Sequence, residues 1–217
     1  MSGGSPDQTG TDDGDFAHAH QSKQPLPPVY SSHGPPEPRR ASHFFEEYLE
    51  LETRSQVRHE LVDGYRFAMA GGTADRNRIC SRLLRLTYDA AEASGCELFI
   101  DDMIVQTPGG KGYYPDLFLT CEESDGRARF KQLPCWVIEV LSESTEAIDR
   151  GEKLHNYKTI PSLKAYVLVS QDQKLVEVYR RLEDGTWRYE TLEGSDVLEL
   201  PCLELSVGLE EIYRAIT

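Results

Sequence analysis

The run Trp136-Val137-Ile138-Glu139-Val140-Leu141 determines how this chain folds and where its chemistry lies. Apart from Glu139, the run is apolar, and its length is typical of a buried strand. A carboxylate inside such a strand costs free energy unless it is paired, neutralised or bound to a cation. Glu139 is therefore the first candidate for a functional side chain.

A second carboxylate stands at the start of another apolar run. The segment Tyr114-Pro115-Asp116-Leu117-Phe118-Leu119-Thr120-Cys121 places Asp116 directly after a proline, which is tolerated at the entry of a strand because no ladder hydrogen bond is needed there. Carboxylates on neighbouring strands supply the oxygen ligands that Mg²⁺ or Mn²⁺ takes. The pattern predicts a divalent-metal site made by Asp116 and Glu139, and the alternative is a solvated strand end with a salt bridge to a buried arginine.

The segment after Glu139 predicts a helix that begins near Thr145, with Asp149, Lys153 and Tyr157 at intervals of four and hence on one face. A lysine on that face can orient or deprotonate a water molecule at the metal, which indicates hydrolysis of a phosphoryl group. Lys153 is the candidate catalytic lysine, and a plain surface ion pair with Asp149 is the alternative. Tyr157 is expected to pack rather than to take part in chemistry.

Five segments together resemble the Uma2 family of restriction-endonuclease-like proteins, also called DUF820, a branch of the PD-(D/E)XK nuclease superfamily. They are, in chain order, Arg58–Gly64, Tyr114–Asp116, Val137–Thr145, Asp149–Lys153 and Tyr157. The resemblance covers roughly residues 43 to 216. It implies an α/β fold with a mixed sheet flanked by helices around a restriction-endonuclease-like core. It also implies that Asp116 and Glu139 bind the metal, that Glu60 is a further acidic member of the site, and that Lys153 is catalytic.

The position of the lysine departs from the usual superfamily pattern. That pattern has the lysine two residues after the acidic ligand, where this chain has Leu141. The resemblance to Uma2 implies that the lysine comes instead from the next helix, where Lys153 stands.

These features predict a Mg²⁺- or Mn²⁺-dependent endonuclease that hydrolyses DNA phosphodiester bonds. The alternative is a catalytically silent protein that keeps the nuclease fold and serves in binding or assembly. A glycosidase with two carboxylates is disfavoured, since Trp136 and Trp187 are the only tryptophans available for a sugar cleft and both stand in strand patterns. A homodimer is expected, because a duplex has two strands to cut and the predicted antiparallel pair near residues 175–190 presents an edge that must be covered.

The formal net charge of −14 is unusual for a protein that binds a polyanion. Affinity for nucleic acid rests largely on neutralised phosphates, which require lysine or arginine side chains at the interface. Either a local basic patch made of Arg76, Arg78, Arg82 and Arg85 serves this purpose, or binding is weak and depends on the metal.

Composition changes abruptly near residue 41. Residues 1–41 are rich in Pro, Gly, Ser and Asp and poor in aliphatic residues, which predicts a disordered tail, and residues 42–217 form the predicted nuclease-like domain. No apolar run approaches transmembrane length, so we expect no membrane contact. The five cysteines have no Cys-x-x-Cys pair and are expected to be free thiols, which favours the cytoplasm.

The periodicity predicts the remaining elements in chain order. Helices are expected from Ser42, from Thr73 to Ser94, from Thr145 to about Ile160, and at residues 209–216. Strands are expected as a hairpin around Asp63-Gly64, at residues 97–107, 114–121, 136–141 and 165–169, and as a second hairpin around Asp184-Gly185.

Overall fold

The structure is a computed structural model that describes residues 41–69, 71–126 and 129–214, with the side chains of its first helix from residue 44 onward. Helix α1 spans Ala41–Arg54, so the predicted tail lies outside the described residues except for Ala41. Strands β1 (His59–Val62) and β2 (Tyr65–Ala68) form the predicted hairpin. Its turn residues Asp63 and Gly64 have φ values of 46° and 91°, as a tight hairpin turn of this hand requires.

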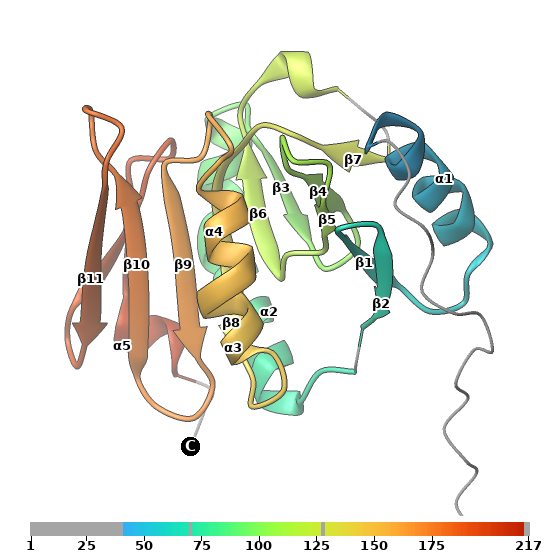
Figure 1. Ribbon diagram of the computed structural model, residues 1–217. Coiled ribbons are helices and arrows are strands. Elements are labelled where there is room, and N and C mark those ends of the chain that lie inside the picture. The colour runs from blue at the N-terminus through green and yellow to red at the C-terminus, as the bar shows by residue number, and fades with distance from the viewer. Residues whose placement is uncertain (1–40, 70, 127–128, 215–217) are drawn as a thin grey trace, which may run out of the picture. The chain divides into compact units, whose positions relative to one another are not determined.

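A mixed six-stranded sheet forms the centre of the fold (Figure 1). Its order is β11-β10-β9-β8-β6-β3, and β8 and β9 are its parallel pair. The strands are β3 (Glu97–Ile100), β6 (Leu117–Thr120), β8 (Pro134–Leu141), β9 (Ala165–Ser170), β10 (Leu175–Arg181) and β11 (Trp187–Glu193). Every residue of β8 and β9 is buried, as expected for strands covered on both faces. The predicted α/β fold with a mixed sheet is confirmed.

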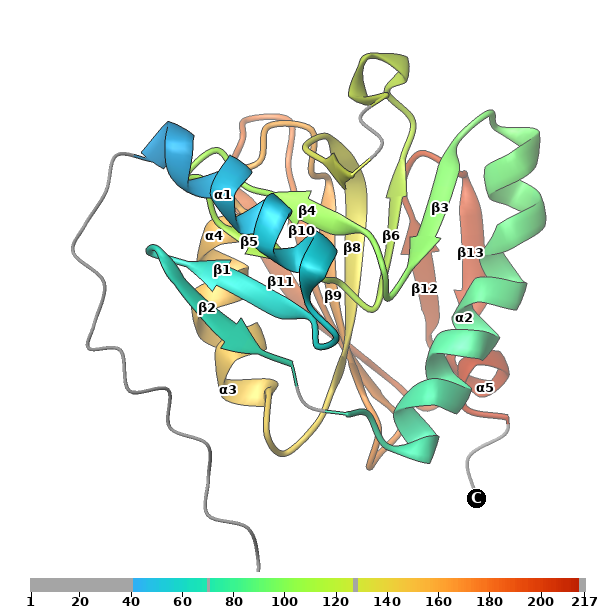
Figure 2. The same ribbon diagram turned by 90° about the vertical axis from the view of Figure 1, so that its right-hand side faces the viewer.

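Helices cover both faces of this sheet (Figure 2). Helix α2 (Ala74–Ala93), capped by Thr73, packs Ile79 and Leu83 against the face that carries Trp136 and Ile138. The opposite face is covered by one continuous helical segment, made of α3 (Glu146–Ile148), the π-helical turn η2 (Asp149–Lys153) and α4 (Leu154–Tyr157). No helix in the described part of the chain is long and apolar enough to cross a membrane.

Side chains alternate along β8, and this alternation directs Glu139. Trp136, Ile138 and Val140 belong to the core under α2, whereas Val137 and Leu141 belong to the core under α4. Glu139 has the same parity as Val137 and Leu141, so it points toward the helical segment that carries Lys153.

The expected strand at residues 97–107 is interrupted, because Asp101 takes a left-handed conformation with φ of 57°. The chain then enters a second sheet, of order β2-β1-β5-β4-β7, which the sequence did not predict. Its added strands are β4 (Ile104–Gln106), β5 (Gly112–Tyr113) and β7 (Phe130–Lys131). Helix α1 packs on this sheet through Phe45, which lies so close to Gly112 that a Cβ there would come within 2.9 Å of its ring.

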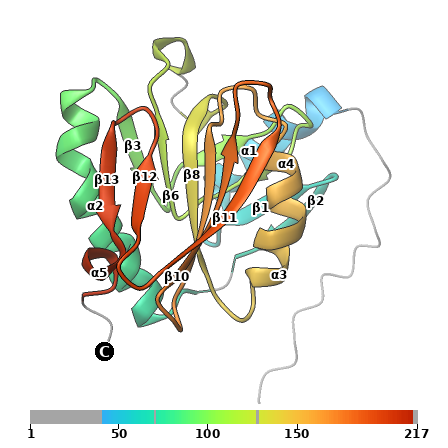
Figure 3. The same ribbon diagram turned by 90° about the vertical axis from the view of Figure 1, so that its left-hand side faces the viewer.

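A hairpin and a short helix near the C-terminus pack against the core under α2. Strands β12 (Val197–Leu200) and β13 (Leu205–Gly208) form a hairpin that was not predicted, and helix α5 (Leu209–Ile212) follows it (Figure 3). The predicted helix reached residue 216, but residues 215–217 lie outside the described part of the chain. A 3₁₀ turn at Glu123–Asp125 completes the elements.

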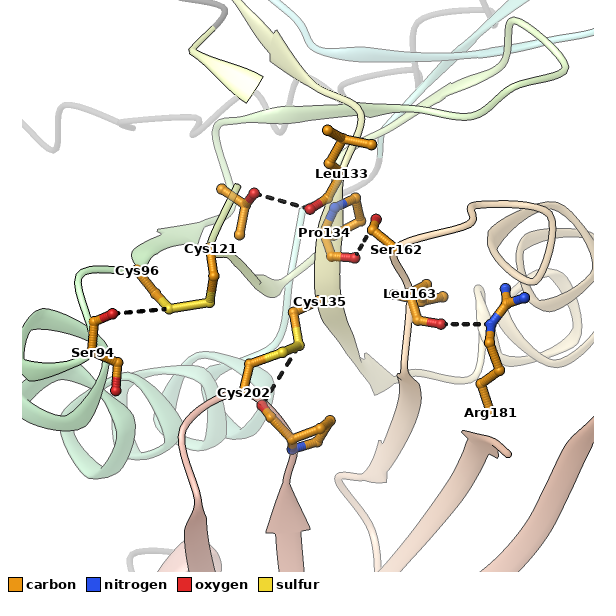
Figure 4. The surroundings of a disulfide bond; sticks show 12 residues. Ser94, Cys96, Cys121, Leu133, Pro134, Cys135, Ser162, Leu163, Arg181 and Cys202 are labelled. Carbon is orange, nitrogen blue, oxygen red and sulfur yellow. Dashed lines mark hydrogen bonds between the residues drawn. A yellow bond between two sulfur atoms is a disulfide. The ribbon is translucent and has the colours of Figure 1, made fainter. Parts of the chain in front are cut away.

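The prediction that the cysteines are free thiols is wrong for four of them. Cys96 pairs with Cys121, and Cys135 pairs with Cys202 (Figure 4). Cys80 is free and buried. The sequence hid these pairs because the partners are 25 and 67 residues apart. Pairing of β3 with β6 brings Cys96 to Cys121, and packing of the β12–β13 hairpin in the core under α2 brings Cys202 to Cys135. Closing loops of these lengths stabilises a fold by roughly 3–4 kcal/mol each in the chain-entropy model.

Candidate active site

Asp116 and Glu139 lie side by side because β6 and β8 are antiparallel neighbours. The backbone N–H of Asp116 donates to Glu139 Oε2 at 3.4 Å, and the N–H of Val140 donates to Asp116 Oδ2 at 2.7 Å. Both acids are 1% exposed. The structure therefore brings together the two side chains that the sequence predicted as a pair.

Lys153 lies at the centre of the predicted acids. Its Nζ is 2.9 Å from Glu60 Oε1, 3.2 Å from Glu139 Oε1 and 3.2 Å from Asp149 Oδ1. The sequence set a catalytic Lys153 against a surface pair of Lys153 with Asp149. The pair with Asp149 is present, but both residues are buried and two more acids share the ammonium, so the simple surface pair is wrong.

Asp149 and Lys153, four residues apart, are the two buried residues of the π-helical turn. A π turn is wider than an α turn, and such turns occur often at functional sites. Arg150, within the same turn, points the other way and donates from Nε and Nη2 to Glu177 Oε1 at 2.9 and 2.7 Å. This contact ties the turn to β10 and holds Lys153 over Glu139.

Glu60 reaches the site from β1, in the second sheet. Contacts with α1 fix this strand: the Tyr48 hydroxyl donates to the His59 carbonyl at 2.6 Å, and Arg66 donates to Glu52 Oε1 at 2.7 Å. Although burial opposes it, hydrogen bonds from Arg66 and His59 lower the pKa of Glu52. The charged anchor on α1 thus positions the hairpin that carries Glu60.

The buried acids perturb one another. Burial raises the pKa of Glu139 well above its ordinary value; the ammonium of Lys153 opposes this rise, and the neighbouring acids reinforce it. Burial favours the neutral form of Lys153, but the carboxylates around it outweigh burial and raise its pKa well above the ordinary value. Lys153 is consequently held as an ammonium ion, which donates hydrogen bonds and cannot act as a base.

Two residues contribute more than the sequence suggested. Tyr157 packs in the core, as predicted, and its hydroxyl also donates to Glu139 Oε1 at 3.3 Å. Asp149 Oδ1 is buried and accepts no hydrogen bond in the described part of the chain, although the Lys153 ammonium lies nearby. The sequence signals for Asp149 were its spacing of four residues from Lys153 and its place in a segment that resembles the Uma2 family.

Arg76 was predicted as part of a basic patch, but it turns inward. Its Nε and Nη2 lie 2.8 and 2.5 Å from Asp116 Oδ1. Arg78 pairs instead with Asp75, at 2.6 Å. Two of the four arginines proposed for the patch are thus already paired with carboxylates.

The donor set fits a divalent cation. Around the site, four carboxylates face two cationic side chains, which leaves an excess of two negative charges when all are ionised; the six residues are Glu60, Asp116, Glu139, Asp149, Arg76 and Lys153. Asp149 Oδ1 accepts no well-directed hydrogen bond within the described residues, and the Lys153 ammonium lies 3.2 Å from it. Within the described residues, however, no three His, Cys, Asp or Glu side chains form a ready-made cation site. Rearrangement of the arginine or the lysine must accompany binding.

Comparison with known proteins gives three findings. The family model described as "Uma2: Putative restriction endonuclease" matches residues 45–210. Two uncharacterized proteins from Synechocystis sp. are similar: slr1290 is 38% identical over 79% of this chain and 91% of its own length, and sll1609 is 31% identical over 69% and 87%. The crystal structure of "a putative nuclease belonging to DUF820" from Anabaena variabilis superposes with a TM-score of 0.64 at 18% identity, over 78% of this chain and 97% of that one. At 18% identity, the similarity to the Anabaena variabilis structure shows a shared fold alone.

The buried carboxyl of Glu139 should make stability depend on pH. Its pKa in the folded protein is raised above the ordinary value of 4.5, so the free energy that it contributes is fully present below that value and is lost as the pH rises through the folded-state pKa. We expect Glu139→Gln to become progressively more stable relative to the unmodified protein between about pH 5 and about pH 8. Urea denaturation at both pH values measures the difference.

The exposed Glu143, just past the end of β8, gives the matched control. Glu143→Gln should leave the difference in stability nearly constant over the same range. If the stability of Glu139→Gln relative to the unmodified protein stays constant or falls as the pH rises, the pKa of Glu139 is not raised in the folded protein.

Proposed function

The chain belongs to the Uma2 family, and on that premise we propose that it is a divalent-metal-dependent endonuclease that hydrolyses phosphodiester bonds in DNA. One observation carries the proposal: Glu60, Asp116, Glu139 and Lys153 converge from two sheets and a helix on one buried site. Buried ionisable groups with strongly shifted pKa values are typical of catalytic sites. The family and the fold support a nuclease in general, and the metal and the DNA substrate are our proposal.

Asp116 and Glu139 are the proposed metal ligands, with Mg²⁺ or Mn²⁺ as the ion. When bound, such an ion polarises a phosphoryl oxygen and lowers the pKa of a water molecule. Asp116 is suited to this role because the Val140 N–H holds its Oδ2 in place. Glu139 is suited because ionisation, which burial disfavours, becomes favourable beside a cation.

Lys153 is proposed to orient the attacking water and to stabilise negative charge that develops on the phosphate. Because its pKa is raised, it acts as a hydrogen-bond donor, and the proton of the water must go elsewhere. Glu60 and Asp149 hold the ammonium in place at 2.9 and 3.2 Å. We assign Glu60 to this positioning role within the catalytic group.

A catalytically silent binding or assembly protein is the second candidate. The ion pair between Arg76 and Asp116 favours it, since a metal ligand that is already paired needs no metal. The net charge of −14 favours it as well, because few cations are left over for DNA. Metal binding without cleavage of any nucleic acid would distinguish this candidate from a nuclease.

The cytoplasm is the proposed location, as the nucleic-acid substrate suggests. The two disulfides weigh against it, since reducing compartments keep thiols from pairing.

Metal-dependent cleavage tests the proposed activity. Plasmid and oligonucleotide DNA should be cut with Mg²⁺ or Mn²⁺ and left intact in EDTA, and Asp116→Ala or Glu139→Ala should abolish cutting. Lys153→Met should lower turnover by about 10²–10³-fold, the scale expected when one hydrogen-bond donor to developing negative charge is removed. Lys158→Met is the control, because Lys158 Nζ lies 4.6 Å from the Tyr179 ring centroid and makes no contact with the acids in the described residues. A fully active Lys153→Met, or a wild-type protein that cuts no nucleic acid, would contradict the assignment.

We also propose a homodimer that pairs through the edge of β11. This strand ends the six-stranded sheet, and Tyr189 on it is 52% exposed. An uncovered edge with exposed apolar surface is a site of association. Light scattering at micromolar concentration should give twice the chain mass of 24.5 kDa, and Tyr189→Lys should shift the mass toward the monomer. A monomer of the unmodified protein would refute the proposal.

A further inference from the structure

Arg76 lies between the buried carboxylate of Asp116, a proposed metal ligand, and an open cleft. It belongs to the first turn of α2, and its side chain is 16% exposed, against 53% for Arg78 two residues later. Every hydrogen bond from its guanidinium to a described residue goes to Asp116, through Nε and Nη2. The first turn of the helix thus directs one arginine into the site and one away from it.

The contact leaves Arg76 able to serve a second partner. Nε and Nη2 both approach the same oxygen, Asp116 Oδ1, whereas Oδ2 is taken by the Val140 N–H. The pair is therefore not the parallel two-oxygen arrangement in which a guanidinium and a carboxylate satisfy each other fully. The same geometry that arginine uses for carboxylates also suits phosphate.

Arg76 and Asp116 also line a cleft of about 330 Å³. Its other walls include Arg58, Thr73 and Asn77, and the glycines at 71 and 72 add no side chain there. Arg58 is engaged by the Asp101 carbonyl at 2.9 Å and by Asp102 at 2.8 Å. The guanidinium of Arg76 thus has the buried carboxylate on one side and an open polar cleft on the other.

We propose that Arg76 is an exchangeable counter-ion, which neutralises Asp116 in the free protein and moves to a phosphate of the substrate in this cleft when a divalent cation takes over Asp116. The inference rests on the proposed function, and it assigns Arg76 as a substrate-binding residue. Charge balance at Asp116 supports the exchange: a divalent cation would replace the single positive charge of Arg76 with two, so the carboxylate stays neutralised when the guanidinium moves to the incoming phosphate. An acidic domain thereby obtains a cation for its substrate only where and when the metal is bound.

Opposite effects on two ligands test this role. In Arg76→Gln, Mn²⁺ should bind roughly tenfold more tightly by calorimetry, because a competing positive charge within a few ångströms of the carboxylate is gone. A fluorescent DNA duplex, titrated in Ca²⁺ with its integrity checked on a gel, should bind roughly tenfold more weakly, because a charge-assisted contact with phosphate is lost. Arg78→Gln, the matched control on the same helix, should change either affinity by less than about twofold.

A purely structural Arg76 predicts a different result. If it only holds Asp116 in place, Arg76→Gln should bind Mn²⁺ more weakly or equally well, and that outcome overturns the inference. An equal loss of DNA affinity in Arg78→Gln would also overturn it, since it would indicate a general effect of charge.

Arg76→Lys keeps the test decisive if the glutamine variant fails to fold. Its Mn²⁺ affinity should stay near that of the unmodified protein, and its DNA affinity should fall by about threefold or more, because an ammonium cannot form the paired contact of a guanidinium. DNA affinity equal to that of the unmodified protein would refute the inference. Both readouts are equilibrium binding, so a protein that follows this pattern and cuts no DNA refutes the proposed hydrolysis alone.

Discussion

The ammonium of Lys153, held among the carboxylates of Glu60, Glu139 and Asp149, is the interaction on which the rest of the site depends. Glu139 is buried in the middle of a strand, and no packing of apolar neighbours can offset the cost of its charge. The ammonium of Lys153, on the helical segment that covers the same face of the sheet, neutralises this charge. Removing one member of such a cluster leaves the charge of the others uncompensated, so the contribution of each acid to stability depends on the lysine.

This cluster also joins the two sheets. Glu139 belongs to the six-stranded sheet, Glu60 to the smaller one, and Lys153 to the π-helical turn between α3 and α4. Glu60, Glu139 and Lys153 therefore stand on strands and on a tethered helical turn, and Asp116 lies in the bend that leads directly into β6. The ion pair of Arg76 with Asp116 adds a second cation on the other side of the acids, next to the cleft. Together the two cations keep a strongly acidic site folded in the absence of metal.

The sequence predicted the central elements because their signals are local. The apolar run around Glu139, the turn at Asp63-Gly64 and the cap at Thr73 each follow from a few adjacent residues, and the structure confirms each element. The signals that failed depend on contacts far apart in the chain. The three strands that were not predicted in the second sheet have only two or three residues, too few for periodicity, and the disulfides join cysteines 25 and 67 residues apart. Arg76 was misplaced for the same reason, since only the fold brings it to Asp116.

A double-mutant cycle between Glu139 and Lys153 tests the central claim most directly. Urea denaturation of Glu139→Gln, Lys153→Met and the double variant gives the free energy of coupling between the two side chains. Lys153→Met alone should lose about 3–5 kcal/mol of stability, because the buried carboxylates are left without their counter-ion. The double variant should recover at least about 2 kcal/mol of that loss, since Glu139, one of the carboxylates without a counter-ion, is replaced by a neutral glutamine. Additive effects, within about 0.5 kcal/mol, would show that Lys153 does not neutralise Glu139 and would contradict the account.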